Sequence, residues 1–245
     1  MTRRRWIADT WTATTATLTG DQAAHLARVL RAEPGQIFDV VAGGFLHRAE
    51  ITGVSEAQVL FTLHEELESD AALPLHLLLA VFKFDHMEWA LEKATELGIA
   101  RITPILARRT EKHLTLAAPK RADRWRRIAL EASKQSRRTD IPEIAAPTTL
   151  KSALEHEQSP TRILLSETEQ ATTLTAALET PVQSISATES VITHALAIGP
   201  EGGWTPEEMT LFTQHKWQPV TLGPRILRAE TAAIAAIAIA STHLA

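Results

Sequence analysis

Three glycines follow an apolar run in residues 197–208, which read AIGPEGGWTPEE. Glycines placed after a buried strand let backbone N–H and C=O groups approach a ligand closely, which suits a nucleotide or a nucleoside. A Walker-type phosphate loop is excluded because its lysine and Ser/Thr are missing, and Glu201 would repel an anion. Thr205 and Glu208 form a capping box for a following helix. The segment predicts either a site for a cationic or zwitterionic adenosine ligand or, more commonly for paired glycines, a tight turn.

A second segment of this kind, residues 222–232, reads LGPRILRAETA. It places Arg225, Arg228 and Glu230 after a predicted strand and a glycine, and open α/β sheets bind their ligands at the carboxyl ends of strands. Each residue also has a structural interpretation, because both arginines can be solvated and Glu230 can stabilise a helix N-terminus. Taken singly, the structural interpretation is the commoner one for all three.

Positive charge is concentrated in residues 101–138, where twelve Lys or Arg stand against three acids in a chain of net charge −4. Such a local field predicts a docking surface for a polyanion, whereas the alternative is a solvated helix face. In the helix predicted at 120–136, Trp125 and Ala129 face inward and basic residues outward, as a phosphate-contacting helix requires. The residues predicted to contact phosphate are Arg124, Arg126, Arg127, Lys134, Arg137 and Arg138.

Strand and helix patterns alternate beyond Pro74. The apolar run 75–82 is typical of a parallel strand buried on both faces. The helix after it has a capping box of Asp85 and Glu88 and ends at Gly98. Strands are predicted at 75–82, 102–106, 162–165, 194–198 and 220–222, and helices at 85–97, 120–136, 174–178, 205–214 and 230–242. This alternation predicts an α/β domain with a parallel sheet. Apart from the helix at 174–178, the low-complexity stretch 170–193 is predicted to be a surface loop.

Residues up to 72 predict a separate, mostly β domain with one early helix. Asp21 is expected to cap that helix and Pro34–Gly35 to end it. Strands predicted at 37–41, 45–51 and 58–64 have the spacing of a small barrel. The acidic residues 65–70 with Pro74 predict a linker. We therefore expect one domain at 1–72 and a second at 73–245.

The composition excludes several classes of protein. With 245 residues, 44% hydrophobic and 22% charged, the chain is typical of a globular protein rather than a disordered, collagen-like or coiled-coil one. The absence of cysteine excludes disulfides and cysteine-bound metal clusters, and the ten histidines form no zinc-binding pair, so no metal is expected. The apolar run 232–240 is too short to span a membrane. Because Asp9 rather than an apolar core follows the basic residues 3–6, we expect a cytoplasmic chain without a signal peptide.

Four motifs match a known family in their order along the chain. They are KATELG at 93–98, the basic helix at 124–138, IGPEGG at 198–203 and LGPRILRAETA at 222–232. With these motifs the chain resembles the RsmE family of the SPOUT superfamily, which methylates N3 of a uridine in small-subunit (16S) ribosomal RNA. The resemblance covers nearly the whole chain, because residues 5–7 and 25–31 also match the family's N-terminal barrel.

The resemblance implies a fold, a cofactor and partners. The fold is a small PUA-like β-barrel for RNA binding, followed by a SPOUT-type α/β methyltransferase domain whose tail is threaded through a trefoil knot. The cofactor is S-adenosylmethionine. The partners are the ribosomal RNA of the small ribosomal subunit and a second copy of the chain, which forms a homodimer through the last helix. The residues implied to hold the cofactor are Leu165, Ser166, Ile198, Gly199, Pro200, Gly202, Gly203, Leu222, Gly223, Ile226, Leu227 and Arg228.

The implied reaction is direct transfer of a methyl group to uracil N3, a weak acid on the Watson–Crick edge that must first be unpaired. Glu230 is expected to orient N3 or accept its proton, and Arg225 or Arg228 to stabilise negative charge on the uracil oxygens. Arg5 is expected to reach the site from the partner's barrel. Two rivals remain open: another SPOUT enzyme, such as a tRNA ribose 2′-O-methyltransferase, and a noncatalytic RNA-binding assembly protein of the same fold.

Two segments depart from the family pattern. Residues 83–86 read KFDH where Lys-Gly-Asp-Arg/Lys is usual, and residues 107–110 read ARRT where Thr-Glu-Arg-Ser is usual. Neither segment lies in the three cofactor loops. The departures therefore bear on contacts with the substrate rather than on the activity.

Overall fold

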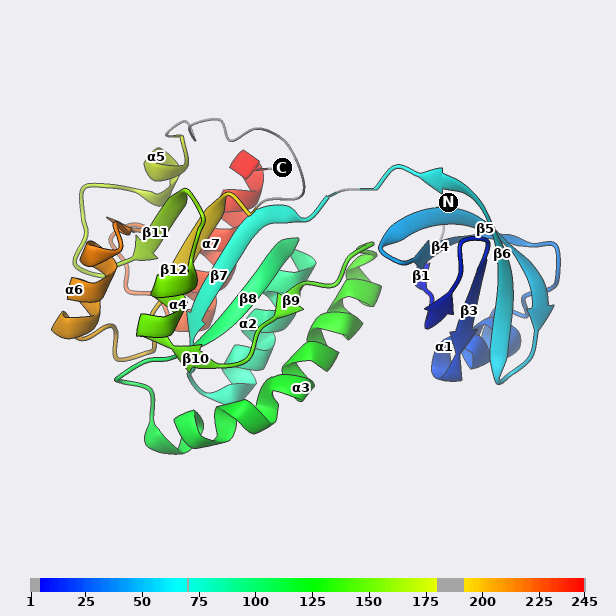
Figure 1. Cartoon of the computed structure of the whole chain (residues 1–245), viewed down its shortest axis with the longest axis horizontal. Helices are drawn as coiled ribbons and strands as arrows, with labels where there is room; N and C mark the ends of the chain where they lie inside the picture. The colour runs from blue at the N-terminus through cyan, green and yellow to red at the C-terminus, as the bar shows by residue number, and fades with distance from the viewer. Residues whose placement is uncertain (1–4, 70, 180–191, 245) are drawn as a thin grey trace. The chain divides into compact units, whose positions relative to one another are not determined.

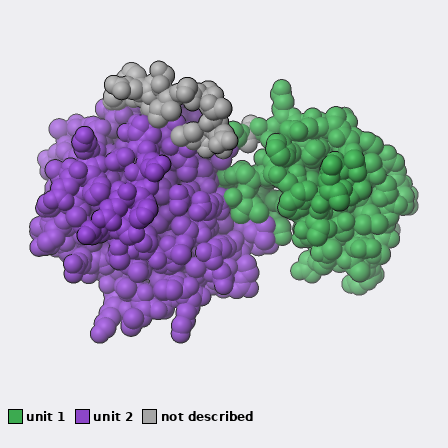
Figure 2. Space-filling model, in the orientation of Figure 1, with its two compact units in different colours: residues 1–71, 133–141 green, residues 72–132, 142–245 purple. Residues whose placement is uncertain are grey.

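The computed structural model describes residues 5–69, 71–179 and 192–244. The chain divides into two compact units, Met1–Ala71 with Ser133–Ile141 and Ala72–Ala132 with Pro142–Ala245 (Figure 2). Residues 133–141 are thus grouped with the first unit, and the boundary expected at 72/73 stays a prediction. The basic residues 3 and 4 and most of the loop predicted at 170–193 lie outside the described residues.

The first unit is built on a six-stranded sheet in the order β1-β4-β5-β6-β3-β2 (Figure 1). Its strands are β1 (Arg5–Ile7), β2 (Thr10–Trp11), β3 (Thr15–Thr19), β4 (Ile37–Ala42), β5 (Phe45–Val54) and β6 (Gln58–Leu67). All pairs are antiparallel except β1 with β4, and Leu18, Ile51 and Phe61 lie in one buried core. Helix α1 (Gly20–Ala24) and the π-helical turn η1 (His25–Val29) add to that core. The three strands predicted here are confirmed.

Two expectations for this unit are wrong. The helix begins at Gly20, so Asp21 lies in its first turn, and Thr19 occupies the N-cap without a side-chain capping bond. The acidic stretch is a linker only in part, because β6 pairs with β5 as far as Leu67, whereas Glu68 and Ser69 lie outside any strand. Pro74 lies inside strand β7 (Leu73–Ala80). Pairing between strands extends order into polar residues that composition alone assigns to a linker.

The second unit contains a sheet whose paired strands are all parallel, in the order β10-β8-β7-β12-β11-β13, with β9 paired to β8. Besides β7, its strands are β8 (Ile99–Leu106), β9 (Glu143–Ile144), β10 (Thr148–Thr149), β11 (Thr161–Leu165), β12 (His194–Ile198) and β13 (Gln218–Val220). The predicted α/β class is confirmed, although the last strand lies at 218–220 rather than 220–222. The carboxyl ends of these strands, and the loops that follow them, share one edge of the sheet.

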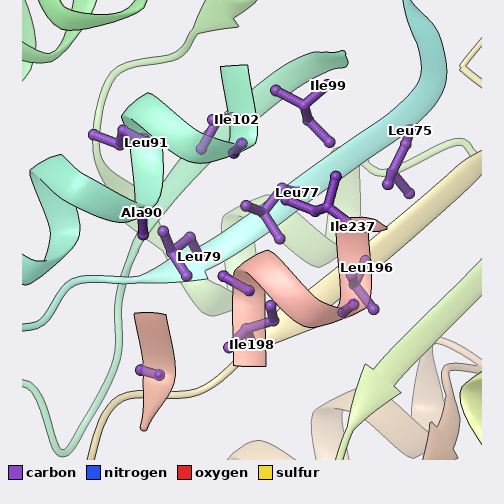
Figure 3. Close-up of a cluster of buried hydrophobic side chains, with 14 of the residues drawn as sticks. Leu75, Leu77, Leu79, Ala90, Leu91, Ile99, Ile102, Leu196, Ile198 and Ile237 are labelled. Carbon is purple, nitrogen blue, oxygen red and sulfur yellow. The ribbon is translucent and has the colours of Figure 1, made fainter. Parts of the chain in front are cut away.

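Helices cover both faces of this sheet (Figure 1). They are α2 (Phe84–Glu96), α3 (Lys112–Ser136), α4 (Leu150–His156), α5 (Leu174–Leu178), α6 (Pro206–Gln214) and α7 (Ala229–Leu244). Leu77 and Leu79 of β7 pack with Leu91 of α2 and Ile237 of α7 on one face (Figure 3). Leu78, which alternates with them, packs with Phe212 of α6 on the other face. No helix in the described part of the chain is long and apolar enough to cross a bilayer.

Long-range contacts change the start of one helix and the predicted cap of another. Helix α3 begins at Lys112 rather than near 120, because Leu114 and Ala118 are buried in the core and hold the additional turns. Helix α2 has Lys83 at its N-cap and no capping side chain, so the capping box predicted for Asp85 and Glu88 is wrong. Glu88 instead accepts two hydrogen bonds of 2.7 Å from Arg124 of α3.

Candidate functional site

The three segments expected to bind a cofactor follow three neighbouring strands of the parallel sheet. Leu165 ends β11 and Ser166 follows it, Ile198 ends β12 and residues 199–203 follow it, and residues 222–228 come after β13. Since β11 pairs with both β12 and β13, the fold brings these segments to one edge of the sheet.

Backbone hydrogen bonds join the segment after β11 to the segment after β13. Ser166 N donates to Val220 O at 3.0 Å, Thr221 N donates to Thr172 O at 2.8 Å, and Leu174 N donates to Thr221 O at 3.1 Å. These bonds hold the start of the 222–228 segment beside the residues that follow Ser166. The two segments are therefore positioned as one structure rather than as independent loops.

The glycine loop after β12 is held by a short turn and by an arginine. Gly203 N donates to Pro200 O at 2.8 Å, and Gly203 has a φ of +68°, which favours glycine over other residues. Arg109, in the loop after β8, donates from Nη1 to Gly202 O at 2.6 Å. A Cβ at Gly199 would lie 3.1 Å from Trp204 Nε1, so the indole packs closely against that glycine.

The capping box predicted for α6 is confirmed, and it reaches beyond its own helix. Glu208 Oε2 accepts a 2.8 Å hydrogen bond from Thr205 N, and Glu208 N donates to Thr205 Oγ1 at 3.3 Å. Glu208 Oε1 accepts a further 2.8 Å bond from the backbone N–H of Arg108. The loop after β8 is thus joined to the loop after β12 by Arg108 and Arg109, which the sequence left outside the site. The sequence feature that could have identified these two arginines is their position directly after a predicted parallel strand.

Glu230, the second residue of α7, is 5% exposed. Its Oε1 lies 3.3 Å from Nδ1 of His86 on α2, and its Oε2 is buried with no hydrogen-bond partner in the described part of the chain. An unsatisfied buried carboxylate oxygen is costly, on the order of 1–3 kcal/mol or more, so a donor brought to this oxygen would stabilise the site. His86 was not among the predicted site residues, although it stands in a segment that departs from the family pattern.

The two arginines of the second glycine segment lie at the surface. Arg225 and Arg228 are exposed, and among the described residues neither guanidinium has an ion-pair partner. Ile226 between them is 82% exposed. This part of the 222–228 segment therefore presents two cations and an apolar side chain beside the start of α7.

Some of the basic side chains that are predicted to contact phosphate already pair with acidic residues. Arg124 is bound by Glu88, and Arg126 Nη1 donates to Asp123 at 2.7 Å. The Arg127 side chain is exposed, and in the described ranges it has no acidic partner.

The last three of these predicted phosphate contacts differ from one another in their exposure. Lys134 is half-buried, and Arg138 is largely buried and pairs with Asp140. Arg137 is exposed, and its carbonyl accepts a 2.8 Å hydrogen bond from Nη1 of Arg5 on β1, in the same unit. Arg5 thus lies in the first unit and Glu230 in the second, and the catalytic role expected for Arg5 stays a prediction.

No group of three or more His, Asp or Glu side chains in residues 5–69, 71–179 and 192–244 is arranged to hold a metal ion. Besides Glu208 and Arg109, which join the loops, the chemistry available at the sheet edge comes from the buried carboxylate of Glu230, the imidazole of His86, two exposed guanidinium groups and the backbone of glycine-rich loops. Such a set suits the binding of a nucleoside-type ligand and the handling of a proton.

Comparison with known proteins agrees with this architecture. Residues 69–241 match the family model described as an RNA methyltransferase domain, and residues 18–63 match the model of an RNA methyltransferase PUA domain. The predicted PUA-like domain and methyltransferase domain are therefore confirmed.

Relatives with a common name cover most of the chain. The ribosomal RNA small subunit methyltransferase E of a Synechocystis strain is 36% identical over 91% of this chain and 72% of its own length. The protein of the same name from Bacillus subtilis is 31% identical over 94% of this chain and 90% of its own length. The crystal structure of that methyltransferase from Neisseria gonorrhoeae, bound to S-adenosylmethionine, superposes with a TM-score of 0.77 and 28% identity over 99% of this chain and 98% of the other. The chain belongs to the ribosomal RNA small subunit methyltransferase E family.

Proposed function

We propose that this protein transfers the methyl group of S-adenosylmethionine to N3 of a uridine in 16S ribosomal RNA. Family membership supports the class of enzyme and of substrate, and the cofactor-bound relative supports S-adenosylmethionine. The single observation that carries the choice of atom is the buried Glu230 carboxylate, whose Oε2 has no partner in the described part of the chain. Because the proposed substrate is ribosomal RNA, we expect the protein to act in the cytoplasm.

The loops at the sheet edge fit S-adenosylmethionine. Gly223 has a φ of +114° and a Cβ built there would meet no atom within 4 Å, so its backbone faces open space. We propose that Leu165 and Ser166, residues 198–203 except Glu201, and residues 222, 223 and 226–228 hold the cofactor. When bound, S-adenosylmethionine supplies an electrophilic methyl group carried on a sulfonium.

The residues around this edge can prepare uracil for methylation. N3–H lies on the Watson–Crick edge, so the uridine must be unpaired before the atom is accessible. Glu230 Oε2 orients N3 and accepts its proton. The exposed cations Arg225 and Arg228 stabilise the negative charge that develops on the uracil oxygens. Arg5 adds a contact from the partner's barrel.

Helix α7 and the loops before it support two further parts of the proposal. Helix α7 carries the half-buried apolar residues Ile234, Ala235 and Ala238, which suit a homodimer interface. The backbone bonds between the segments after β11 and β13 suit a chain whose tail is threaded through a trefoil knot. Arg127 and Arg137, with their exposed guanidinium groups, are the proposed phosphate contacts that remain open on and just after α3, while Arg124, Arg126, Lys134 and Arg138 supply positive charge around them.

Methylation of purified small ribosomal subunits that lack the mark, followed by mapping of the modified nucleotide by mass spectrometry, tests this function. We expect one methyl group per subunit, located on the base of a uridine. A methyl group on a ribose 2′-oxygen, or methylation of tRNA in preference to the subunit, would favour the rival SPOUT activity. Failure to bind S-adenosylmethionine in calorimetry would favour a noncatalytic assembly protein.

A further inference from the structure

His86 is the one side chain that forms an ion-pair contact with Glu230 in the described part of the chain. Its Nδ1 lies 3.3 Å from Glu230 Oε1, and its Nε2 lies 3.8 Å from Oδ2 of Asp85. The imidazole is 34% exposed, whereas the Glu230 side chain is 7% exposed. The ring therefore stands between a buried carboxylate and solvent.

Helix packing fixes both residues at this contact. Helices α2 and α7 cover the same face of the sheet, where Leu91 of α2 and Ile237 of α7 share one buried cluster (Figure 3). His86 is in the first turn of α2 and Glu230 is in the first turn of α7, so the contact joins the starts of two packed helices. A contact between two helix starts is not easily lost while the helices remain packed.

The two arginines that α3 presents to α2 already have a partner. Arg121 and Arg124, which α3 presents to α2, pair with Glu88 at 3.4 and 2.7 Å. Asp85 is the second acid near the His86 ring, but its side chain is 79% exposed and therefore well solvated. The buried Glu230 carboxylate is consequently the stronger partner for the imidazole, because polar interactions are stronger where water is excluded.

We propose that His86 is a positioning residue that contacts Glu230 Oε1 and thereby fixes the orientation of Oε2 for the proposed reaction. The inference rests on the proposed function, in which Oε2 accepts the N3 proton while the N3–methyl bond forms and the methyl–sulfonium bond breaks. Without the imidazole, both carboxylate oxygens would lack a fixed partner and the side chain could turn. A carboxylate in the wrong rotamer is a poor proton acceptor even when the cofactor is correctly bound.

Steady-state kinetics on small ribosomal subunits tests this role with three variants. We expect His86→Ala to lower kcat about tenfold and to leave the affinity for S-adenosylmethionine within about twofold. His86→Asn, whose side-chain amide can occupy the place of Nδ1, is expected to recover kcat to within about threefold of the wild type. His156→Ala, which removes an exposed imidazole on α4, serves as the matched control and is expected to leave kcat unchanged.

A double-mutant cycle separates this inference from the proposed function. If His86 acts through Glu230, His86→Ala in a Glu230→Gln background lowers kcat by less than about twofold beyond Glu230→Gln alone. An active Glu230→Gln variant would overturn the role of Glu230 and the inference with it. An inactive Glu230→Gln variant together with a fully active, folded His86→Ala variant would overturn the inference alone.

Nuclear magnetic resonance gives a readout that does not depend on activity. The imidazole nitrogen resonances of His86 are expected to shift in Glu230→Gln, and those of His156 are expected to stay in place. Unchanged His86 resonances in a folded Glu230→Gln variant would show that the two side chains do not interact, and would overturn the inference.

Discussion

His76 on β7 and Glu157, which directly follows α4, form a buried pair in which Nδ1 and Oε2 are 2.5 Å apart. His76 Nε2 lies 2.8 Å from Oγ1 of Thr103 on β8, and Glu157 Oε1 accepts a 2.8 Å bond from Ser159 N. These contacts connect two central strands to the segment that leads into β11. A buried carboxylate is tolerated here because its oxygens have donors.

The Glu157 pair predicts a loss of stability in acid. Burial by itself would raise the pKa of the Glu157 carboxyl, but the hydrogen bond and attraction of His76, with the bonds from Ser159, lower that pKa to about 2. A pKa lower in the folded chain than in the unfolded one stabilises the fold above the unfolded value, and this contribution is lost as the pH falls from about 4.5 to about 2. It amounts to about 3 kcal/mol. Urea unfolding at pH 7, 4 and 3 measures it.

Glu157→Gln is expected to lower the free energy of unfolding at pH 7 and to make it less dependent on pH below 4.5. Glu155→Gln, at an exposed carboxylate of α4 that lies 3.8 Å from Lys151 Nζ, is the matched control. If the free energy of unfolding falls equally in acid for both variants, the pair of His76 and Glu157 does not determine its dependence on pH.

Glu230→Gln distinguishes a role in the reaction from a role in the helix. If Glu230 accepts the N3 proton, the amide keeps the shape but loses the acceptor charge, so we expect turnover to fall roughly 10²–10⁴-fold with cofactor binding preserved. Part of the loss is expected to be relieved at higher pH, where more uridine is ionised. Turnover is measured with radioactive methyl donor on small subunits.

Glu207→Gln is the control for that substitution, because Glu207 is also the second residue of a helix but is exposed. A carboxylate that only complements a helix dipole contributes at most about 1 kcal/mol to stability and nothing to turnover. If Glu230→Gln keeps more than about a tenth of wild-type turnover, Glu230 is not the proton acceptor. Positioning and desolvation are then the main contributions to catalysis.

Gly203→Val is expected to abolish measurable cofactor binding, because a branched side chain would occupy the space beside the loop backbone. The φ of +68° also disfavours valine, so the variant is expected to lose about 1–2 kcal/mol of stability while remaining folded. Isothermal calorimetry with S-adenosylmethionine measures the binding. Gly44→Val places the same strain at a φ of +90° in the first unit, and full cofactor affinity there with none in Gly203→Val would assign the effect to the loop.

Arg127→Glu is expected to weaken RNA binding and to flatten its dependence on salt, because a phosphate contact that releases counterions is replaced by a repulsion. Cofactor affinity is expected to be unchanged. Binding to a 16S RNA fragment at several salt concentrations gives the slope. Lys151→Glu, at a side chain that is 71% exposed on α4, reverses a charge outside the basic helix. If RNA binding depends on salt with the same slope in both variants, α3 is a solvated helix face rather than a phosphate-contacting one.

Predictions that depend on local hydrogen bonds agree with the structure. The α6 start was predictable because Thr205, Pro206 and Glu208 form its cap within four residues. The strand at 194–198 and the helix at 174–178 have the predicted bounds. Gly98 also follows α2 with a φ of +93°, as its residue type requires.

Predictions fail where a distant residue competes for a local partner. Asp85 and Glu88 have the spacing of a capping box, but Arg124 lies beside Glu88 in the folded chain and forms a stronger, charge-assisted pair with it. Pro74 has the residue type of a linker, but pairing with neighbouring strands places it within β7. In both cases the deciding contact comes from a segment that local pattern does not identify.

The sequence by itself determined the glycine loops, the cap of α6 and the alternation that makes a parallel sheet, because these depend on residues a few positions apart. It also carried the family motifs. The contact between His86 and Glu230, and the hydrogen bond from Arg109 to Gly202, were decided only by the tertiary structure. Parallel strands bring the loops after β7, β8 and β12 and the start of α7 to one edge of the sheet. No spacing along the chain encodes which side chains then meet there.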